Sequence, residues 1–336
     1  MSLIEVSVIV VIRNEENFVV NCIRSICNQF NIETNWELIL VNSCSTDKSM
    51  LKAEQYLGQT SINYKILENE KKILSSGWNI GIKEAKGKFV IRPDAHSELI
   101  NNYIMTGVTI LQNNNEITAV GGRLITEGKG FWGGIIKEAL SSKVCVGNSS
   151  FRTNKKDGFV DTAVYAVYRK EIFDKVGYFN ENLVRHQDNE MHERIHAVGG
   201  KFYLSTKMRA IYFCRGNIPS LLKQMYAIGI YLPNAGIKSL KIRHLIPFAF
   251  LIFLFVGAGI SIFSEYIRMV YITTLLFYLT VIFIEFSNKS IRNGNLPLML
   301  NVAIVPLIHI AYGFGTLIGF FNLFKKTFSV KRLFVL

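Results

Sequence analysis

The first hundred residues alternate between short β-branched runs and stretches whose apolar residues recur at helical spacing. Residues 6–12 read VSVIVVI, a run typical of a strand buried on both faces of a sheet. After it, the apolar residues at positions 18, 19, 22, 23, 26 and 27 form one face of a helix. The same reasoning predicts strands at 37–41, 63–67 and 88–92 and a helix at 76–85. This alternation favours an α/β fold, with an open, mostly parallel sheet and helices on both faces.

The middle of the chain is less regular. Residues 125–158 are rich in Gly, Ser, Asn and Lys, which predicts a long loop of a functional or mobile kind. Order returns at 159–168, followed by a helix from Lys170 and a charged helix over about 188–198. These elements extend the first predicted domain to residue 240.

Three long apolar stretches follow, at residues 245–263, 269–286 and 296–321. Each is long enough to cross a bilayer. The third contains Pro297, Pro306 and a flexible run at 313–315, Gly-Phe-Gly. Buried core helices are the alternative, but a chain of 336 residues cannot supply the apolar shell that three such helices need. We therefore predict a membrane region over residues 241–336.

The net charge of +13 fits the same arrangement. Basic residues are scattered, without zinc-finger spacing or an arginine-rich run, so we expect no nucleic-acid partner. Lys238, Lys241 and Arg243 adjoin the first apolar stretch, as cytoplasmic juxtamembrane residues do. Three full crossings would place the basic tail at 325–332 outside, against the positive-inside rule, so a re-entrant third segment stays open.

The cysteines and the start of the chain indicate the compartment. Five widely spaced cysteines, an odd number, are typical of reduced thiols and not of a disulfide framework. A strand begins almost at once, so no signal peptide is predicted. We expect residues 1–240 to form a cytosolic domain attached to the cell membrane by a multi-pass region.

Polar residues follow the predicted strands, and ligands of open α/β sheets bind beyond the carboxyl ends of the strands. Asp94 and His96 come directly after the strand at 88–92 and, two residues apart in an extended chain, point to the same side. A carboxylate suits Mn²⁺ or Mg²⁺ and an imidazole favours Mn²⁺, so the pair is a candidate for holding a metal ion against a diphosphate. A solvated turn is the alternative.

Two other polar groups allow two interpretations each. The residues at 14, 15, 42, 45 and 47 suit binding of a base and ribose, or turn and cap chemistry. Asp188 precedes a predicted helix and is either a helix cap or a general base. No Gly-x-Gly-x-x-Gly follows the first strand, which argues against a dinucleotide-binding enzyme.

Together these motifs resemble glycosyltransferase family 2, whose members have the GT-A fold. The resemblance lies in the order VIVVIRNEE at 8–16, VNSCSTD at 41–47, DAH at 94–96 and DNE at 188–190. The chain is similar in particular to bacterial succinoglycan-type glucosyltransferases of exopolysaccharide synthesis, which have an Asp-Ala-His metal motif and hydrophobic C-terminal segments. The resemblance covers residues 5 to about 235 well and the remainder loosely.

The resemblance implies a role for each matching residue. Asp94 and His96 become ligands of the metal and the diphosphate. Asp188 becomes the catalytic base, and Glu190 supports the site. The residues implied to contact the nucleotide sugar are Arg13, Asn14, Glu15, Asn42, Ser45, Asp47, Gly77, Asn79, Asp94 and Gln224.

Two positions depart from the family pattern. Asn42 stands where the family usually has an aspartate that touches the base and ribose, so the choice of donor base is open. Ala227 and Ile228 replace the Arg and Trp of a Gln-x-x-Arg-Trp region, which favours the addition of one sugar over processive synthesis.

The implied reaction is a single displacement with inversion. It moves a sugar from a nucleotide sugar, a UDP-sugar by preference, to a polyprenyl-diphosphate-linked glycan, with Mn²⁺ or Mg²⁺ as cofactor. A sugar-nucleotide pyrophosphorylase is one rival, but it needs a Gly-rich basic loop after the first strand, where this chain has IRNE. A non-catalytic membrane scaffold or transport component is another, and it would tolerate Asp188→Asn.

Overall fold

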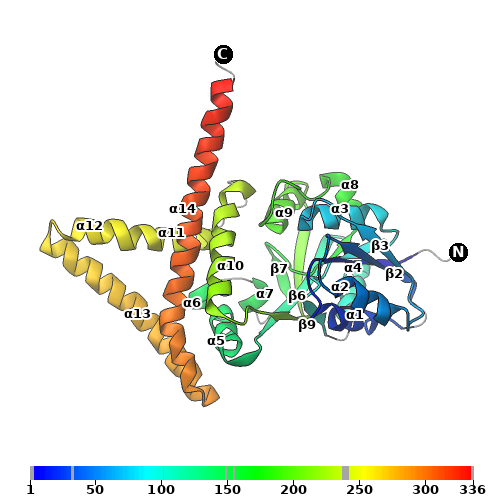
Figure 1. Cartoon of the computed structure of the whole chain (residues 1–336), viewed down its shortest axis with the longest axis horizontal. Coiled ribbons are helices and arrows are strands. Elements are labelled where there is room, and N and C mark those ends of the chain that lie inside the picture. Colours follow the sequence, from blue (N-terminus) through cyan, green and yellow to red (C-terminus); the bar gives the residue numbers. More distant parts are fainter. Residues whose placement is uncertain are drawn as a thin grey trace. The chain divides into compact units, whose positions relative to one another are not determined.

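The computed structural model describes residues 4–31, 34–100, 102–147, 150–153, 156–236 and 242–333. The chain divides into two compact units (Figure 1). The first comprises residues 1–125 and 150–213, and the second comprises 126–149 and 214–336. The predicted boundary at residue 240, between a cytosolic and a membrane region, concerns compartments and stays a prediction.

The first unit alternates strands and helices much as the sequence pattern predicts. The strands at 6–12, 37–41, 63–67 and 88–92 and the helix at 76–85 are found to within two residues. The elements are β1 Val6–Ile12, α1 Val19–Cys27, β2 Trp36–Asn42, α2 Ser49–Leu57, β3 Tyr64–Glu68, α3 Leu74–Glu84, β4 Phe89–Ile91, β5 Ser97–Leu99, α4 Tyr103–Asn113, β6 Ile117–Glu127, α7 Ser150–Thr153, β7 Gly158–Val160, β8 Val167–Arg169, α8 Glu171–Val176, α9 Gln187–Ala197 and β9 Lys201–Phe213.

The sheet runs in the order β3-β2-β1-β4-β8-β6-β9-β5, with β7 beside β9. Its first four strands are parallel. Parallel neighbours need a crossover connection, and α1, α2 and α3 supply one for each step from β1 to β4. By contrast, β8 is antiparallel to both β4 and β6, and β5 and β7 are antiparallel to β9. The sheet is therefore mixed, and the expectation of a mostly parallel sheet holds only for its first half.

Alternation along β1 divides the core between the two faces of the sheet. The even-numbered residues from Val6 to Ile12 pack with α1, α2 and α4. Ile9 and Val11 pack with α3, α8 and α9 on the other face. Figure 1 shows these two groups of helices on opposite sides of the strands. Every residue of β1 is buried, as the β-branched run predicts.

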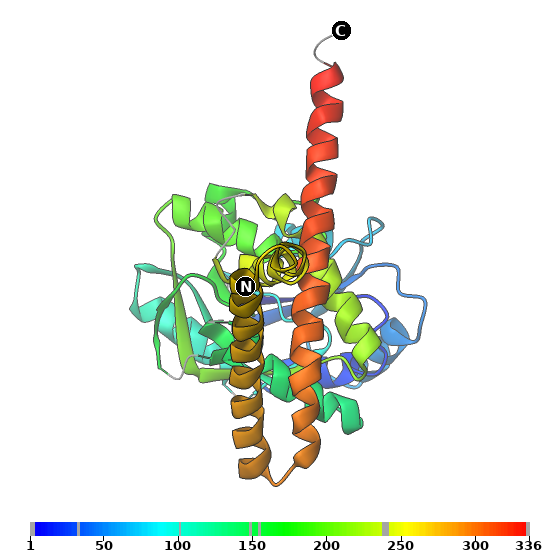
Figure 2. The same cartoon turned by 90° about the vertical axis from the view of Figure 1, so that its left-hand side faces the viewer.

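The second unit is helical among the residues that the structure describes. Its elements are α5 Gly130–Leu140, α6 Lys143–Val146, α10 Ile218–Tyr231, the 3₁₀ turn η1 Pro233–Ala235, α11 Ile242–Ile252, a π-helical turn Phe253–Gly257, α12 Ala258–Ser261, α13 Glu265–Asn293, the 3₁₀ turn η4 Leu296–Leu300 and α14 Asn301–Leu333. Apolar residues of α5, α10, α13 and α14 form its core. Helices α13 and α14 meet at η4 and make a hairpin (Figure 2).

The long loop predicted over residues 125–158 is wrong. Strand β6 continues to Glu127, and α5 and α6 follow it. Glycines at 130, 133 and 134 hide the helical pattern, but Ile135, Ile136, Ala139 and Leu140 are buried on one face of α5. Burial of this face in the second unit offsets the low helix propensity of glycine.

The flexible run expected at 313–315 is also wrong, because α14 is helical from Asn301 to Leu333. Its glycines are packing positions. A Cβ added to Gly315 would lie 2.2 Å from the Tyr226 carbonyl oxygen on α10, and one added to Gly313 would lie 2.3 Å from the Pro247 carbonyl oxygen on α11. Small residues of this kind let helix backbones approach closely.

Three helical segments are long and apolar enough to cross a membrane, at Ile242–Ser261, Glu265–Asn293 and Leu296–Lys325. Each overlaps one of the predicted apolar stretches. The segments differ in how far the rest of the chain buries them. In the most apolar part of the second segment 6% is buried, whereas in that part of the third segment 44% is buried. The exposed apolar surface of α13 therefore needs a membrane or another partner more than that of α14 does.

Candidate active site

Several of the predicted site residues of the first unit lie on loops that leave one edge of its sheet. Strands β2, β1 and β4 are parallel neighbours, so their carboxyl ends lie together. The loops that follow them are residues 43–48, 13–18 and 92–96. The tertiary structure thus brings together polar residues that are far apart in the sequence, such as Glu15 and His96, which are 81 positions apart.

The loops after β1 and β2 bind each other through a compact set of hydrogen bonds. The Asn42 Oδ1 accepts from the backbone N–H of Ser45 at 2.9 Å, and its Nδ2 donates to Glu68 Oε2 at 3.0 Å. Asn14, in the left-handed region at φ 56°, accepts from the N–H of Thr46 at 2.8 Å. These are the side-chain to backbone hydrogen bonds that are typical of turns. They also fix the loop that the resemblance assigns to the nucleotide.

Asp47 orders the beginning of α2. Its carboxylate accepts from the N–H of Ser49 at 3.0 Å, from the Ser49 hydroxyl at 2.5 Å and from the N–H of Glu16 at 3.1 Å. Burial raises the pKa of Asp47, but the hydrogen bonds lower it by more, so the pKa lies below its ordinary value. The carboxylate is thus held as an anion at a loop junction.

Asp94 and His96 converge beyond β4. The His96 Nε2 lies 4.0 Å from Asp94 Oδ2, and Nδ1 is 3.0 Å from the carboxylate of Glu15. A carboxylate on the far nitrogen is the usual support of a metal-binding imidazole, because it fixes the ring and the tautomer. Tyr165 donates its hydroxyl proton to Asp94 Oδ2 at 3.1 Å. Burial and the charge of Asp94 raise the pKa of Tyr165 well above its ordinary value, so its hydroxyl stays a donor.

This donor set fits a divalent cation with two protein ligands. Among the described residues, no group of three or more His, Cys, Asp or Glu side chains is placed to hold a metal. Mg²⁺-type sites are often built from one or two carboxylates with phosphate oxygens and water completing the shell. Asp94 and His96 therefore suit a metal bound together with a diphosphate better than a metal bound by the protein alone.

The predicted base lies in the first turn of α9. Asp188 Oδ1 is hydrogen-bonded to Nη2 of Arg92, which immediately follows β4. The carboxylate is 40% exposed and the Arg92 side chain 6% exposed. Because Arg92 is two residues before Asp94, this contact places the start of α9 beside the predicted metal ligands.

Other predicted residues make contacts within the protein. Glu190 binds Arg194 through both carboxylate oxygens, at 2.8 and 2.9 Å. Asn79 is buried, and its amide exchanges hydrogen bonds with the N–H and carbonyl of Phe179 at 2.8 and 2.9 Å. Gly77 lets α3 approach β1, since an added Cβ would lie 2.8 Å from a methyl carbon of Val11. A nucleotide role for Asn79 and Gly77 stays a prediction.

Two further predicted residues, Arg13 and Gln224, lie away from Asp94, His96 and Asp188 in the sequence. Arg13 donates from Nη1 to the carbonyl oxygen of Lys72 at 3.0 Å. Gln224 lies on α10 in the second unit, so its role at the nucleotide stays a prediction.

Sequence reasoning missed Arg92, Tyr165 and Tyr168 as parts of the site. Arg92 adjoins the Asp94 motif, but an arginine at the end of a strand carries no sign of its burial. The two tyrosines lie in a stretch predicted only as ordered structure. One indication for Arg92 was present in the sequence, because it is a charged residue between an apolar strand and the predicted metal ligands.

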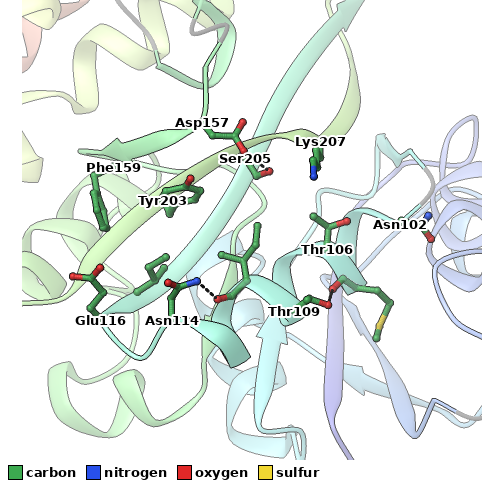
Figure 3. Close-up of a pocket in the computed structure, with 13 residues that line it drawn as sticks. Asn102, Thr106, Thr109, Asn114, Glu116, Asp157, Phe159, Tyr203, Ser205 and Lys207 are labelled. Atoms are coloured by element: carbon green, nitrogen blue, oxygen red, sulfur yellow. Dashed lines mark hydrogen bonds between the residues drawn. The ribbon is translucent and has the colours of Figure 1, made fainter.

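A pocket of about 690 Å³ lies elsewhere on the first unit, between α4 and β9 (Figure 3). None of the predicted site residues lines it. Both of its carboxylates have partners, since Asp157 accepts from Thr206 and Ser205 and Glu116 accepts from Lys201. Pocket size and chemistry therefore point to different places, and we assign the reaction to the edge where Asp94, His96 and Asp188 gather.

Comparison with known proteins gives the class. Residues 7–177, more than half of the 336, match the family described as Glycosyl transferase family 2. The chain belongs to this family and is a glycosyltransferase, as the motif order predicts. Its first unit is the family's mixed α/β sheet.

Individual relatives share much of the chain. One, from Methanococcus voltae, is the dolichyl N-acetyl-alpha-D-glucosaminyl phosphate 3-beta-D-2,3-diacetamido-2,3-dideoxy-beta-D-glucuronosyltransferase; it is 28% identical over 285 residues, 80% of this chain and 86% of the relative. The succinoglycan biosynthesis protein ExoA of Rhizobium meliloti is 25% identical over 198 residues, which are 58% of this chain and only 59% of the relative. The predicted similarity to succinoglycan-type enzymes is confirmed.

A solved structure agrees on the fold. The mannosyltransferase PcManGT from Pyrobaculum calidifontis, in complex with GDP-Man and Mn²⁺, superposes with a TM-score of 0.61, 14% identity, and coverage of 92% of this chain and 86% of that chain. At this identity the likeness shows the fold alone, which is the predicted GT-A fold.

Proposed function

We propose that this glycosyltransferase moves one sugar, with inversion, from a UDP-sugar to a polyprenyl-diphosphate-linked glycan at the cytoplasmic face of the cell membrane. The observation that carries the proposal is the contact between Arg92 and Asp188. It sets a partly exposed carboxylate beside the Asp94–His96 pair at one edge of the sheet. The M. voltae relative, whose name gives a dolichyl-phosphate-linked acceptor, supports the lipid-linked acceptor.

In this mechanism Asp188 removes the proton of the acceptor hydroxyl. The hydroxyl oxygen then bonds to the anomeric carbon from the face opposite the diphosphate, and the bond from that carbon to the diphosphate oxygen breaks. The leaving nucleoside diphosphate takes the bonding electron pair, and Asp188 later releases its proton to water. One positioned base accounts for about 10²–10⁴-fold of the rate in such reactions.

Asp94 and His96 would hold Mn²⁺ or Mg²⁺, which supplies positive charge beside the departing diphosphate. Glu15 orients the His96 ring through its 3.0 Å contact. The loops that carry Asn14, Asn42 and Asp47 would hold the nucleotide, and Glu190 supports α9 through Arg194.

The full-length protein in detergent tests the proposal directly. UDP-glucose, UDP-N-acetylglucosamine and GDP-mannose, each radiolabelled, are incubated with Mn²⁺ and a short polyprenyl diphosphate that carries N-acetylglucosamine. We expect label from a UDP-sugar in the lipid fraction, and about 10²–10⁴-fold slower labelling with Asp188→Asn. Label that appears only from GDP-mannose, or that never reaches the lipid, would contradict the donor or the acceptor.

The same proposal places residues 1–240 in the cytoplasm and anchors residues 241–336 in the cell membrane. Apolar insertion does not depend on charge, so the protein should stay in the membrane pellet after washes with high salt and at alkaline pH. Release by salt alone would show that basic residues, and not spanning helices, hold it there.

A further inference from the structure

Arg92 is a charged side chain in an apolar place. Only 6% of it is exposed, although a guanidinium is among the groups least often buried. Trp78 covers the guanidinium carbon at 3.8 Å from its ring centre, and Phe179 does so at 4.4 Å. The Tyr168 ring lies 5.8 Å away. We call Arg92 with these three rings the arginine cage.

The surrounding contacts hold the cage rigidly. Asn79 binds both the N–H and the carbonyl of Phe179. Arg194, bound to Glu190, donates to the carbonyl oxygens of Val176 and Tyr178 and so fixes the loop that leads to Phe179. Two predicted site residues, Asn79 and Glu190, thereby support the ring that covers Arg92.

A buried hydrogen-bond chain begins at the same guanidinium nitrogen, Nη2, that contacts Asp188. Arg92 Nη2 donates to the Tyr168 hydroxyl at 3.4 Å, and that hydroxyl is 2.8 Å from His192 Nε2. Burial lowers the pKa of His192 to about 3, so the imidazole is neutral. Tyr168 accepts from Arg92 and so donates to Nε2, which leaves Nδ1–H to donate to the Thr162 hydroxyl at 2.8 Å.

The buried guanidinium needs an explanation other than stability. A buried ion pair is often no more stable than apolar residues of similar volume, so stability alone does not explain an arginine here. What the arginine supplies is a fixed donor at Asp188. It engages Oδ1, while Oδ2 has no hydrogen bond from the part of the chain that the structure describes.

We propose that Arg92 is the positioning residue of Asp188: it fixes the carboxylate through Oδ1 so that Oδ2 faces the acceptor hydroxyl. The inference rests on the proposed function of Asp188 as the base. Arg92 does not touch the substrate, and it acts only through the carboxylate. Its loss should therefore lower the turnover number and leave the affinity for the donor unchanged.

A double-mutant cycle on the full-length protein tests this role. The variants are Arg92→Gln, Asp188→Asn and the double variant, assayed with the UDP-sugar that gives transfer above. Loss of an orienting contact around a reactive group typically costs about 10–100-fold, and we expect kcat of Arg92→Gln to fall by this amount with KM for the donor unchanged. In the Asp188→Asn background the same change should cost less than about 3-fold, because the carboxylate it positions is gone.

Arg169→Gln is the matched control. Arg169 lies on β8 beside Tyr168, and it binds the carbonyl oxygens of Leu111, Asn114 and Ile117, where α4 leads into β6. Its loss should lower the melting temperature and leave kcat of the folded protein within about twofold. If Arg92→Gln does not fold, Arg92→Lys, which keeps the charge and loses the planar fork, replaces it in the cycle.

The outcomes separate the two proposals. An equal cost of Arg92→Gln in both backgrounds, or a fall in kcat no larger than that of Arg169→Gln, would reduce Arg92 to a structural residue while Asp188 stays the base. Near wild-type transfer by Asp188→Asn would overturn the base, and the role of Arg92 with it.

Discussion

Two groups of polar residues lie at the same edge of the sheet and are held in opposite ways. The loops at residues 13–16 and 42–49, which we propose bind the nucleotide, are joined by hydrogen bonds between short side chains and backbone N–H groups and are partly exposed. The arginine cage instead buries a guanidinium charge among aromatic rings, and the guanidinium pairs with one carboxylate, that of Asp188. We expect the first group to adjust when a ligand binds and the second to keep its arrangement.

The difference fits the two tasks that we propose for these groups. A nucleotide can be bound by loops that adjust, because its binding free energy is spread over many hydrogen bonds and no single atom needs one fixed position. Proton abstraction depends on one atom at one place, and small misplacements of a reacting group are costly. We therefore expect changes in the loops to alter binding and changes around the cage to alter turnover.

The largest effect is expected for Asp188→Asn. The amide cannot accept a proton, so transfer should fall by about 10²–10⁴-fold while affinity for UDP changes little. Transfer rate, calorimetric UDP affinity and melting temperature are measured on the same protein. A helix cap would behave differently, because Asn caps a helix nearly as well as Asp. Near wild-type transfer would then be observed.

The second effect concerns Asp94. Asp94→Ala should remove the gain in UDP affinity that Mn²⁺ gives, which we expect to be roughly tenfold or more, or at least 1.4 kcal/mol. Titration of UDP by calorimetry with and without Mn²⁺ measures it. Asp157→Ala removes a carboxylate of the same unit outside the site and is the control. Equal UDP affinity of the wild-type protein in both conditions would rule out the metal role.

The third prediction distinguishes support from contact at Asn79. Asn79→Ala leaves the N–H and carbonyl of Phe179 without their partner, and each unsatisfied buried group costs about 1–3 kcal/mol. Thermal unfolding should show a clear loss of stability, with UDP affinity of the folded protein unchanged. A selective loss of UDP affinity at normal stability would instead support the nucleotide contact that the resemblance implies.

The smallest effect concerns pH and Asp47. Its pKa is lower in the folded protein, so its carboxylate stabilises the fold above its ordinary pKa, and this contribution is lost as the pH falls through the lowered value. The melting temperatures of wild type and Asp47→Ala should therefore differ at pH 6 and converge toward pH 2–3. A difference that grows as the pH falls would contradict the sign.

The sequence by itself determined the elements whose pattern is local. The run from Val6 to Ile12 predicts a doubly buried strand because all of its residues except Ser7 are apolar and β-branched. The three apolar stretches predict membrane-length helices in the same way. The order of the polar motifs also carried the resemblance to the family, and three of the four motifs include or follow a strand whose position the pattern gives.

Only the tertiary structure decided what the polar residues touch. Arg92 and Asp188 are 96 positions apart, and their contact depends on α9 packing beside the end of β4. Helix α5 was missed because its stability comes from burial in the second unit and not from its glycine-rich sequence. Local propensity determines a helix or strand when the residues within it are enough to stabilise it. A buried charge or a glycine-rich helix is stable only because residues distant in the sequence enclose it.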